Sequence, residues 1–351
     1  MNDKKLNLRL HAFELPLKHA FGISRRTHSV QESLVVELSD GRVRGFGEAV
    51  AVPYYGMSLS RIYNAVNGVR EVVESLDWQH PSDFWNEIAG KLKGEAFALC
   101  AIDQAVHDLW GKQAQRPTHE MLGFSFGAEP LSSFTIGIDS IEKMVSKLNE
   151  EPDWPIYKIK LGTQQDLEIV TELRKHSDSV FRVDANCGWT AETAISNSKV
   201  LADLGVEFIE QPLPASDIEG SKRVFQESAL PVIADESCQV PSDVQRCFNC
   251  FHGVNIKLVK CGGMTPAIAM IQNAKDLGMK VMIGCMTESS VGISAIAQLL
   301  PLLDYVDIDG ANLLAGDIAQ GVRVINGRCE FSSASGNGLV MVDLAQSVPC
   351  Q

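Results

Sequence analysis

The fold is best indicated by one stretch, Tyr157-Lys158-Ile159-Lys160-Leu161-Gly162, which reads YKIKLG. Its alternation predicts a β-strand that ends at the glycine. Side chains two positions apart on a strand point to one face, so Lys158 and Lys160 place two ammonium groups side by side. In isolation such a pair is typical of a solvated strand edge. The rest of the chain gives it another interpretation.

Seven further segments resemble YKIKLG in length and apolar content, and amphipathic segments such as 166–177, 190–205 and 265–278 separate them. Regular alternation of strands and helices predicts a parallel (β/α)7β TIM-like barrel. A doubly wound sheet is the competing fold, but no GxGxxG motif follows the first strand. The seven segments are SFTIGID (133–139), VFRVDAN (180–186), EFIEQP (207–212), PVIADES (231–237), GVNIKLV (253–259), KVMIGCM (280–286) and YVDIDG (305–310).

The regions on either side of the barrel have a different pattern. Segments 6–15 and 32–50 alternate like strands, the second with a turn at Ser39–Gly41, and 59–76 and 96–114 have helical periodicity. We therefore expect an α+β capping domain at 1–125 and the barrel at 126–320. Residues 321–351 are expected to return to the capping domain.

Composition excludes some classes of partner. The chain has 351 residues, 45% of them hydrophobic, and a formal net charge of −13. This charge disfavours nucleic acids and anionic membranes, which select basic surfaces. No apolar run has the length of a membrane span, and the N-terminus lacks the apolar core of a secretory signal. Nine dispersed cysteines predict reduced thiols and a cytoplasmic location, with the Cys247–Cys250 CxxC pair interpreted as incidental.

Polar residues close nearly every predicted barrel strand. In a parallel barrel these strand ends form the active-site face, and charges there are costly to bury unless they are paired or bind metal. Three carboxylates on neighbouring strands suit Mg²⁺, which prefers oxygen ligands. The alternative is a structural salt-bridge network with the lysines. The strand-end residues are Lys158, Lys160, Asp184, Asn186, Glu210, Asp235, Glu236, Lys257, Lys260, Asp307 and Asp309.

The lysines suggest proton transfer. A lysine titrates near pKa ~10.4, too high for a base at neutral pH, and a neighbouring ammonium or metal cation disfavours its charged form. Lys158 is therefore expected to lower the pKa of Lys160. Lys257 arrives from the sixth strand, across the barrel from Lys160. Two such groups on opposite faces of a substrate could remove and return a proton at one carbon.

Together these motifs resemble the enolase superfamily, specifically its muconate-lactonising subgroup. They are KIK (158–160), DAN (184–186), EQP (210–212), ADES (234–237) and NIKLVKCGG (255–263). The resemblance implies an isomerase that abstracts a proton α to a carboxylate and uses Mg²⁺ to stabilise the enediolate. It further implies Asp184, Glu210 and Asp235 as metal ligands, with Lys160 and Lys257 as the acid/base pair. The seventh strand ends without the histidine of the mandelate-racemase branch, which disfavours acid-sugar dehydration.

The eighth strand discriminates among the activities of the subgroup. Asp307 and Asp309 share a face and suit an ammonium group, and the pair resembles the DxD of dipeptide epimerases, which holds the substrate's N-terminus. Lys158, Thr135, Cys285 and Met286 are implied as further substrate contacts. Cycloisomerase, o-succinylbenzoate synthase and N-acylamino acid racemase activities remain alternatives, as does a non-catalytic binding protein. A simple Asp-Gly turn would also explain the motif.

Two segments of the capping domain, 20–30 and 50–59, are expected to be loops that set specificity. Arg25 or Arg26 could meet a side-chain carboxylate, although a solvated loop charge is the simpler explanation. Tyr54 and Tyr55 could close the site and exclude water. The preferred substrate is therefore L-Ala-D/L-Glu, whose epimerisation is a step in handling peptidoglycan peptides. Hydrophobic dipeptides are the alternative. The partner is a small-molecule dipeptide, and a homo-oligomer is compatible with this barrel class.

Overall fold

The structure is a computed structural model that describes residues 5–23, 26–342, 344 and 347. Its centre is a parallel sheet of eight strands in the order β11-β10-β9-β8-β7-β6-β5-β4. A parallel bridge between Ser132 and Val306 joins the two edges, so the sheet forms a nearly closed barrel. The strands are β4 (Phe134–Ile136), β5 (Ile156–Lys160), β6 (Val180–Asp184), β7 (Val206–Glu210), β8 (Val232–Ala234), β9 (Gly253–Ile256), β10 (Lys280–Gly284) and β11 (Tyr305–Asp307).

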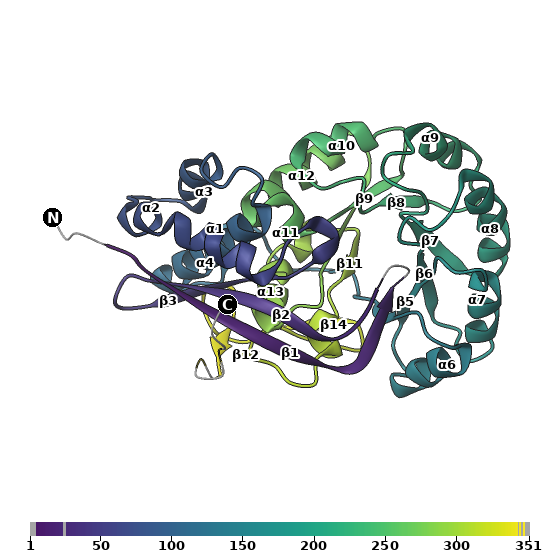
Figure 1. Cartoon of the computed structure of the whole chain (residues 1–351), viewed down its shortest axis with the longest axis horizontal. Helices are drawn as coiled ribbons and strands as arrows, with labels where there is room; N and C mark the ends of the chain where they lie inside the picture. Colours follow the sequence, from purple (N-terminus) through teal and green to yellow (C-terminus); the bar gives the residue numbers. More distant parts are fainter. Residues whose placement is uncertain (1–4, 24–25, 343, 345–346, 348–351) are drawn as a thin grey trace.

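Helices follow the first seven strands and cover the outside of the barrel (Figure 1). Ser140, Thr190, Asp217 and Ser289 precede four of them, and their side chains accept first-turn backbone N–H groups. The predicted (β/α)7β barrel is therefore confirmed. The helices are α6 (Ile141–Glu150), α7 (Asp166–Arg174), α8 (Ala191–Asp203), α9 (Ile218–Glu227), α10 (Pro241–Cys247), α11 (Leu258–Cys261), α12 (Met264–Asp276) and α13 (Ser290–Ala297).

An antiparallel sheet of three strands belongs to the N-terminal region. It comprises β1 (Asn7–Ile23), β2 (Arg26–Ser39) and β3 (Arg44–Val50), in the order β1-β2-β3. Segment 20–30, expected as a loop, is mostly strand in the structure, because the pairing of β1 with β2 continues to Ile23 and Arg26. Segment 50–59 contains a short 3₁₀ helix, η1 (Pro53–Tyr55).

Helices pack on this sheet. The segment predicted as one helix at 59–76 divides at Val69 into α1 (Leu59–Gly68) and α2 (Arg70–Ser75), and α3 (Pro81–Ala89) and α5 (Thr118–Met121) are shorter. The long helix α4 (Ala96–Ala114) has the predicted bounds. A Cβ atom on Gly47 would lie 2.1 Å from the Ala101 carbonyl oxygen, so glycine is what lets β3 lie directly against α4.

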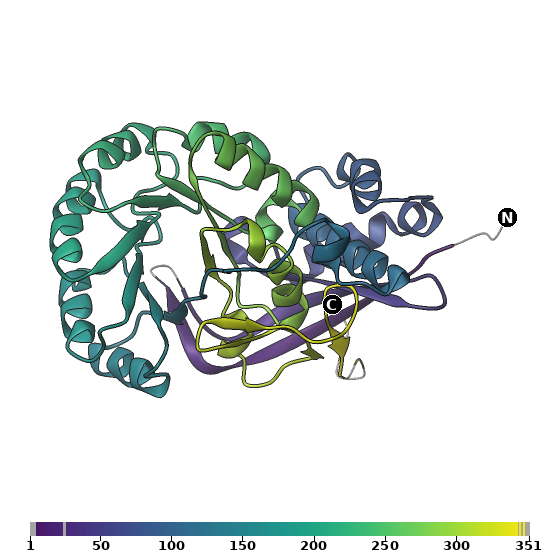
Figure 2. The ribbon, with the colours of Figure 1, turned by 180° about the vertical axis from the view of Figure 1, so that it is seen from behind.

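The C-terminal residues form two small antiparallel pairs, β12 (Ala319–Gln320) with β15 (Val340–Met341) and β13 (Arg323–Ile325) with β14 (Arg328–Glu330). The short helices η2 (Leu300–Leu302) and η3 (Gly310–Leu313) flank β11. Contacts with the N-terminal region include a bridge between Leu17 and Leu314 and another between Pro117 and Gly336. Figure 2 shows this yellow segment lying along the purple strands. The boundaries at 125 and 320 stay predictions.

Among the described residues, no helix is both long and apolar enough to cross a membrane.

Candidate active site

Three buried carboxylates meet at the carboxyl ends of adjacent barrel strands. Asp184 ends β6, Glu210 ends β7, and Asp235 follows β8, and strand register pairs Asp184 directly with Glu210. One oxygen from each lies within 4.8 Å of the others, and this trio is the only potential metal-binding group of its kind in the described part of the chain. All three are at most 1% exposed.

The four strand-end lysines are buried and pair with these carboxylates. Lys160 donates to Asp184 over 2.7 Å, and Lys257 donates to Asp235 over 2.8 Å. Lys260 holds the other oxygen of Asp235 at 2.5 Å and also donates to its carbonyl oxygen. One carboxylate thus receives two ammonium groups, which hold the pKa of Asp235 well below its usual range despite its burial.

Lys158 is surrounded by carboxylates. Its Nζ atom lies 2.8 Å from Glu210 Oε2, 2.8 Å from Asp307 Oδ2 and 3.2 Å from Asp184 Oδ2. Burial lowers the pKa of Lys158, but the charges of Asp307, Glu210 and Asp184 outweigh it and raise that pKa well above its usual value. Three carboxylates therefore surround Lys158 more closely than the sequence had revealed.

The carboxylates fit a hard divalent cation. Burial and the neighbouring Asp184 raise the pKa of Glu210 to about 7, so this carboxyl group lacks sufficient positive charge around it. The lysine network anticipated as the alternative is present, yet it contains more carboxylates than ammonium groups. A bound divalent cation would offset the difference, and all the donors are oxygen atoms of the type that Mg²⁺ prefers. The network comprises Asp184, Glu210, Asp235, Asp307 and Asp309 with Lys158, Lys160, Lys257 and Lys260.

The second acidic pair lies at the end of β11. Asp307 accepts the Ser133 hydroxyl at 2.7 Å. Asp309 accepts the backbone N–H of Thr135 at 2.6 Å and the Thr135 hydroxyl at 3.1 Å. Burial and the charge of Asp307 raise the pKa of Asp309 to about 7. Thr135, predicted as a substrate contact, therefore also orients Asp309, whereas the contact of Ser133 with Asp307 was not predicted.

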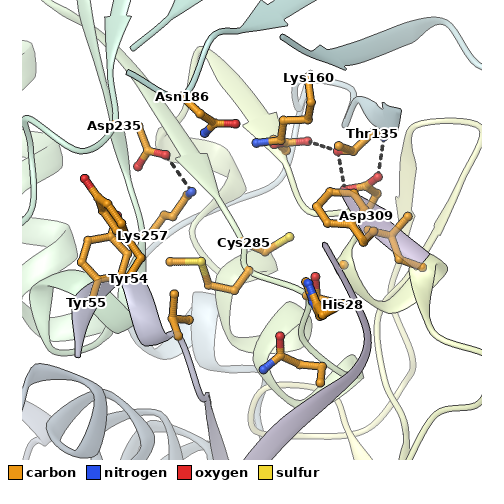
Figure 3. A pocket seen from close by; sticks show the side chains of 18 of the residues that line it. His28, Tyr54, Tyr55, Thr135, Lys160, Asn186, Asp235, Lys257, Cys285 and Asp309 are labelled. Atoms are coloured by element: carbon orange, nitrogen blue, oxygen red, sulfur yellow. Dashed lines mark hydrogen bonds and ion pairs between the residues drawn. The ribbon is translucent and has the colours of Figure 1, made fainter. Parts of the chain in front are cut away.

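These residues border a cavity of about 450 Å³ between the barrel end and the N-terminal sheet. Figure 3 shows Tyr54 and Tyr55 near the Asp235–Lys257 pair, with Thr135 and Asp309 at the other side of the view and Cys285 between them. Asp184 and Glu210 are fully buried and are not among the residues that line the cavity. The predicted residues that line the cavity are Tyr54, Tyr55, Thr135, Lys158, Lys160, Asn186, Asp235, Glu236, Lys257, Cys285, Met286, Asp307 and Asp309.

Several lining residues were missed by sequence reasoning. Phe21 lies on β1, and His28 and Gln31 lie on β2. The Gln31 side chain donates to the carbonyl oxygens of Glu32 and Ala51, each over 2.9 Å, and so joins β2 to the 50–59 segment. The alternation of β2 could have signalled these residues only if the segment had been recognised as strand rather than loop.

The predicted arginines cannot be placed in the site. Arg25 lies outside the described residues, and for Arg26 only the backbone position at the start of β2 is described. The two tyrosines contact each other edge to face with ring centroids 4.9 Å apart. Both members of the CxxC pair, Cys247 and Cys250, are buried away from this cavity.

Two family models cover most of the chain. The model "Mandelate racemase / muconate lactonizing enzyme, N-terminal domain" matches residues 7–123, and "Enolase C-terminal domain-like" matches residues 141–345. The chain belongs to the mandelate racemase / muconate lactonizing enzyme family of the enolase superfamily. Membership of this family confirms the resemblance seen in the strand-end motifs.

Proteins similar to this chain include several dipeptide epimerases. An L-Ala-D/L-amino acid epimerase from Flavobacterium johnsoniae is 52% identical over 337 residues, which cover 96% of this chain and all of the relative. A substrate-liganded L-Ala-D/L-Glu epimerase from Bacillus subtilis superposes with a TM-score of 0.92 at 26% identity, covering 96% of this chain and 99% of that one. A dipeptide epimerase from Enterococcus faecalis, complexed with Mg and L-Leu-L-Tyr, gives 0.88 at 29% identity, covering 97% and 99%.

Proposed function

We propose that this chain is a Mg²⁺-dependent dipeptide epimerase that inverts the α-carbon of the C-terminal residue by two-base proton transfer. The observation that carries the proposal is the placement of Lys160 and Lys257. They come from β5 and from the end of β9, four positions apart in the order of eight strands, and both line one cavity. Such groups reach opposite faces of a substrate held between them.

In this mechanism one lysine removes the α-proton as a neutral amine, and the other, as an ammonium, returns a proton to the opposite face. The first must therefore lose its proton before it acts, and the second must carry one. Asp184 holds the Lys160 ammonium at 2.7 Å and Asp235 holds that of Lys257 at 2.8 Å, so each lysine is oriented by a different carboxylate. Exchange of the two roles makes the reaction reversible.

Asp184, Glu210 and Asp235 are the proposed ligands of Mg²⁺. The bound cation would supply positive charge that stabilises the enediolate formed when the α-proton leaves. The remaining polar residues would orient the substrate. Cys285 and Met286 line the cavity and would contact the carboxyl end of the dipeptide.

Asp307 and Asp309 are the proposed acceptors of the substrate's N-terminal ammonium. Lys158 already pairs with Asp307 at 2.8 Å, whereas Asp309 is held by the two donors of Thr135. Asp309 is therefore the better placed of the two to receive a new cation. An N-acylated substrate has no such charge, and this disfavours racemases of N-acylamino acids.

The side-chain preference is the least constrained part of the proposal. The name of the Flavobacterium relative supports an N-terminal alanine followed by varied residues, and L-Ala-D/L-Glu remains the preferred substrate if Arg25 or Arg26 meets its carboxylate. Hydrophobic dipeptides are the second candidate. Val52, Pro53 and Leu313 give the cavity an apolar wall, which favours them.

The test is incubation in D₂O with Mg²⁺ and a dipeptide library, scored by mass spectrometry for gain of one deuteron. We expect label in L-Ala-X dipeptides and none in N-acylated amino acids. Lys160→Ala and Lys257→Ala should each abolish epimerisation, while each still exchanges the α-hydrogen of one stereoisomer only. Full epimerisation by either variant would contradict the two-base mechanism, and an unlabelled library would contradict the proposed function.

We also propose a cytoplasmic location, which nine dispersed cysteines support. A homo-oligomer remains a prediction that size-exclusion chromatography with light scattering would test.

A further inference from the structure

A buried carboxylate of the N-terminal sheet binds the start of a barrel helix. Glu48 on β3 is fully buried, and its side chain accepts the backbone N–H of Ser289 at 3.1 Å, the Ser289 hydroxyl at 2.5 Å and the backbone N–H of Gly292 at 3.0 Å. The Ser33 hydroxyl donates to its other oxygen at 2.6 Å. Glu48 lies 241 residues before Ser289 in the chain, so no local capping signal could specify this contact.

The helix that Glu48 caps is α13, and the segment before it forms part of the cavity wall. Met286 and Thr287 line the cavity between β10 and α13. Cys285 donates its N–H to the Asp307 carbonyl oxygen at 2.9 Å, and Met286 donates its N–H to the Glu288 side chain at 2.8 Å. The segment is thus tied at one end to β11, and at the other end a bond within the segment holds its backbone directly before Ser289 and α13.

The same segment packs closely against the residue that follows Asp309. A Cβ atom on Gly310 would lie 2.4 Å from the Met286 carbonyl oxygen and 2.9 Å from the Glu288 nitrogen. Movement of the segment would therefore change its position relative to Asp309, the proposed ammonium acceptor. The start of α13 and the ammonium site are mechanically connected.

Glu48 is itself held rigidly. Its backbone N–H donates to the Gln104 side chain on α4 at 3.0 Å, and Gly45 and Gly47, which precede it on β3, let that strand lie against the helix. A carboxylate is also favoured at a helix N-terminus by the exposed N–H groups and the helix dipole. A rigid, complementary anion of this kind fixes the start of α13 relative to the N-terminal sheet.

We propose that Glu48 is a positioning residue for substrate binding. It keeps the cavity segment 285–288 in a fixed position relative to Asp309, and this position determines the affinity for the dipeptide. Glu48 does not line the cavity, so it acts through α13 and not by contact with substrate. This inference rests on the proposed epimerase function for its kinetic part, but its structural part is independent of any activity.

The chain offers a matched control. Asp103 on α4 is 1% exposed and also caps a barrel helix across the same interface, accepting the Thr265 N–H at 3.0 Å and the Thr265 hydroxyl at 2.7 Å at the start of α12. None of the residues at the start of α12 lines the cavity. Asp103→Asn therefore removes an equivalent cap without disturbing the cavity wall.

The experiment compares Glu48→Gln with Asp103→Asn by backbone hydrogen exchange, calorimetry and steady-state epimerisation. We expect both variants to lower Tm. Only Glu48→Gln should speed amide exchange in peptides covering residues 285–292, and only it should raise KM, by tenfold or more, with a smaller change in kcat. Glu48→Asp, which keeps the charge, should show a weaker form of the same pattern and serves if Glu48→Gln does not fold.

Two results would overturn the inference. One is unchanged amide exchange at 285–292 in the Glu48 variants. The other is a KM shift that Asp103→Asn reproduces, because that would show general destabilisation. Wild-type protein that epimerises no dipeptide would contradict the proposed function, and the exchange comparison would then decide by itself whether Glu48 positions the segment.

Discussion

Replacing Lys158 by methionine removes the ammonium group that three buried carboxylates share. Lys158 is 2% exposed, and Glu210, Asp307 and Asp184 lie 2.8, 2.8 and 3.2 Å from its Nζ atom. Methionine fills much of the same volume but carries no charge. The carboxylates would then lie buried without their common counter-ion, so we expect a large loss of stability when no metal is bound.

Removing one partner of a buried ion pair costs about 3–5 kcal/mol. Unfolding entropy of about 2.1 cal/mol/K per residue gives roughly 0.7 kcal/mol/K for a chain of 351 residues, so Tm should fall by about 4–7 °C. Mg²⁺ bound at Asp184 and Glu210 would neutralise two of the three carboxylates. The variant should therefore gain more stability from Mg²⁺ than the wild type does.

The assay is calorimetry of both proteins in EDTA and in saturating Mg²⁺. Lys175→Met is the control, because Lys175 makes an ion pair of similar length, 2.6 Å, with Glu172, but its side chain is 62% exposed. Exposed pairs are hydrated and screened, so this variant should have a Tm close to that of the wild type in both buffers. If Lys158→Met were as stable as the wild type in EDTA, Lys158 would not be needed to neutralise the three carboxylates. The same conclusion would follow if Mg²⁺ raised the Tm of both proteins equally.

Two further predictions concern Asp309 and Glu288. Asp309→Asn should lower kcat/KM for dipeptides with a free N-terminus by about 30-fold or more, since truncation of a buried charge partner costs about 2–5 kcal/mol; unchanged dipeptide turnover would favour the N-acylamino acid alternative. Burial and the charge of Glu48 raise the pKa of Glu288 from 4.5 to about 8. The folded state therefore keeps a proton that the unfolded state loses between these values, so Glu288 lowers stability progressively as pH rises through that window and no further above it. Calorimetry should show that Glu288→Gln has a higher Tm than the wild type above pH 8 but not below pH 4.5. A Tm difference that does not depend on pH would contradict the raised pKa of Glu288.

Local pattern predicted most of the barrel and failed at the edges of the N-terminal sheet. The eight barrel strands alternate with helices whose caps are encoded by adjacent residues such as Ser140 and Thr190, so each unit could be recognised alone. Segment 20–30 was expected as a loop because the resembled family has specificity loops in its capping domain, whereas pairing extends β1 to Ile23 and starts β2 at Arg26. This cross-strand pairing depends on tertiary context more than on local preference.

The order of strands along the chain was enough to predict which polar residues converge at the barrel end. Parallel strands end at one rim of a barrel, so residues closing successive strands must converge, and Asp184, Glu210, Asp235, Lys160 and Lys257 could be named from strand ends alone. Oxygen donors and opposed lysines suggested metal-assisted proton transfer, and the resemblance of the motifs to the enolase superfamily favoured it over a structural salt-bridge network.

The hydrogen-bond partners of those residues could be seen only in the folded structure. Lys158 lies 149 residues from Asp307, Thr135 lies 174 from Asp309, and Glu48 lies 241 from Ser289, yet each pair is in hydrogen-bond contact. Side-chain pairing at such separations depends on barrel closure and on the packing of the N-terminal sheet over the barrel, neither of which leaves a periodic trace in the chain. Periodicity in the sequence indicates which face of a helix or strand a side chain lies on. The packing of the whole fold determines which residues that side chain contacts.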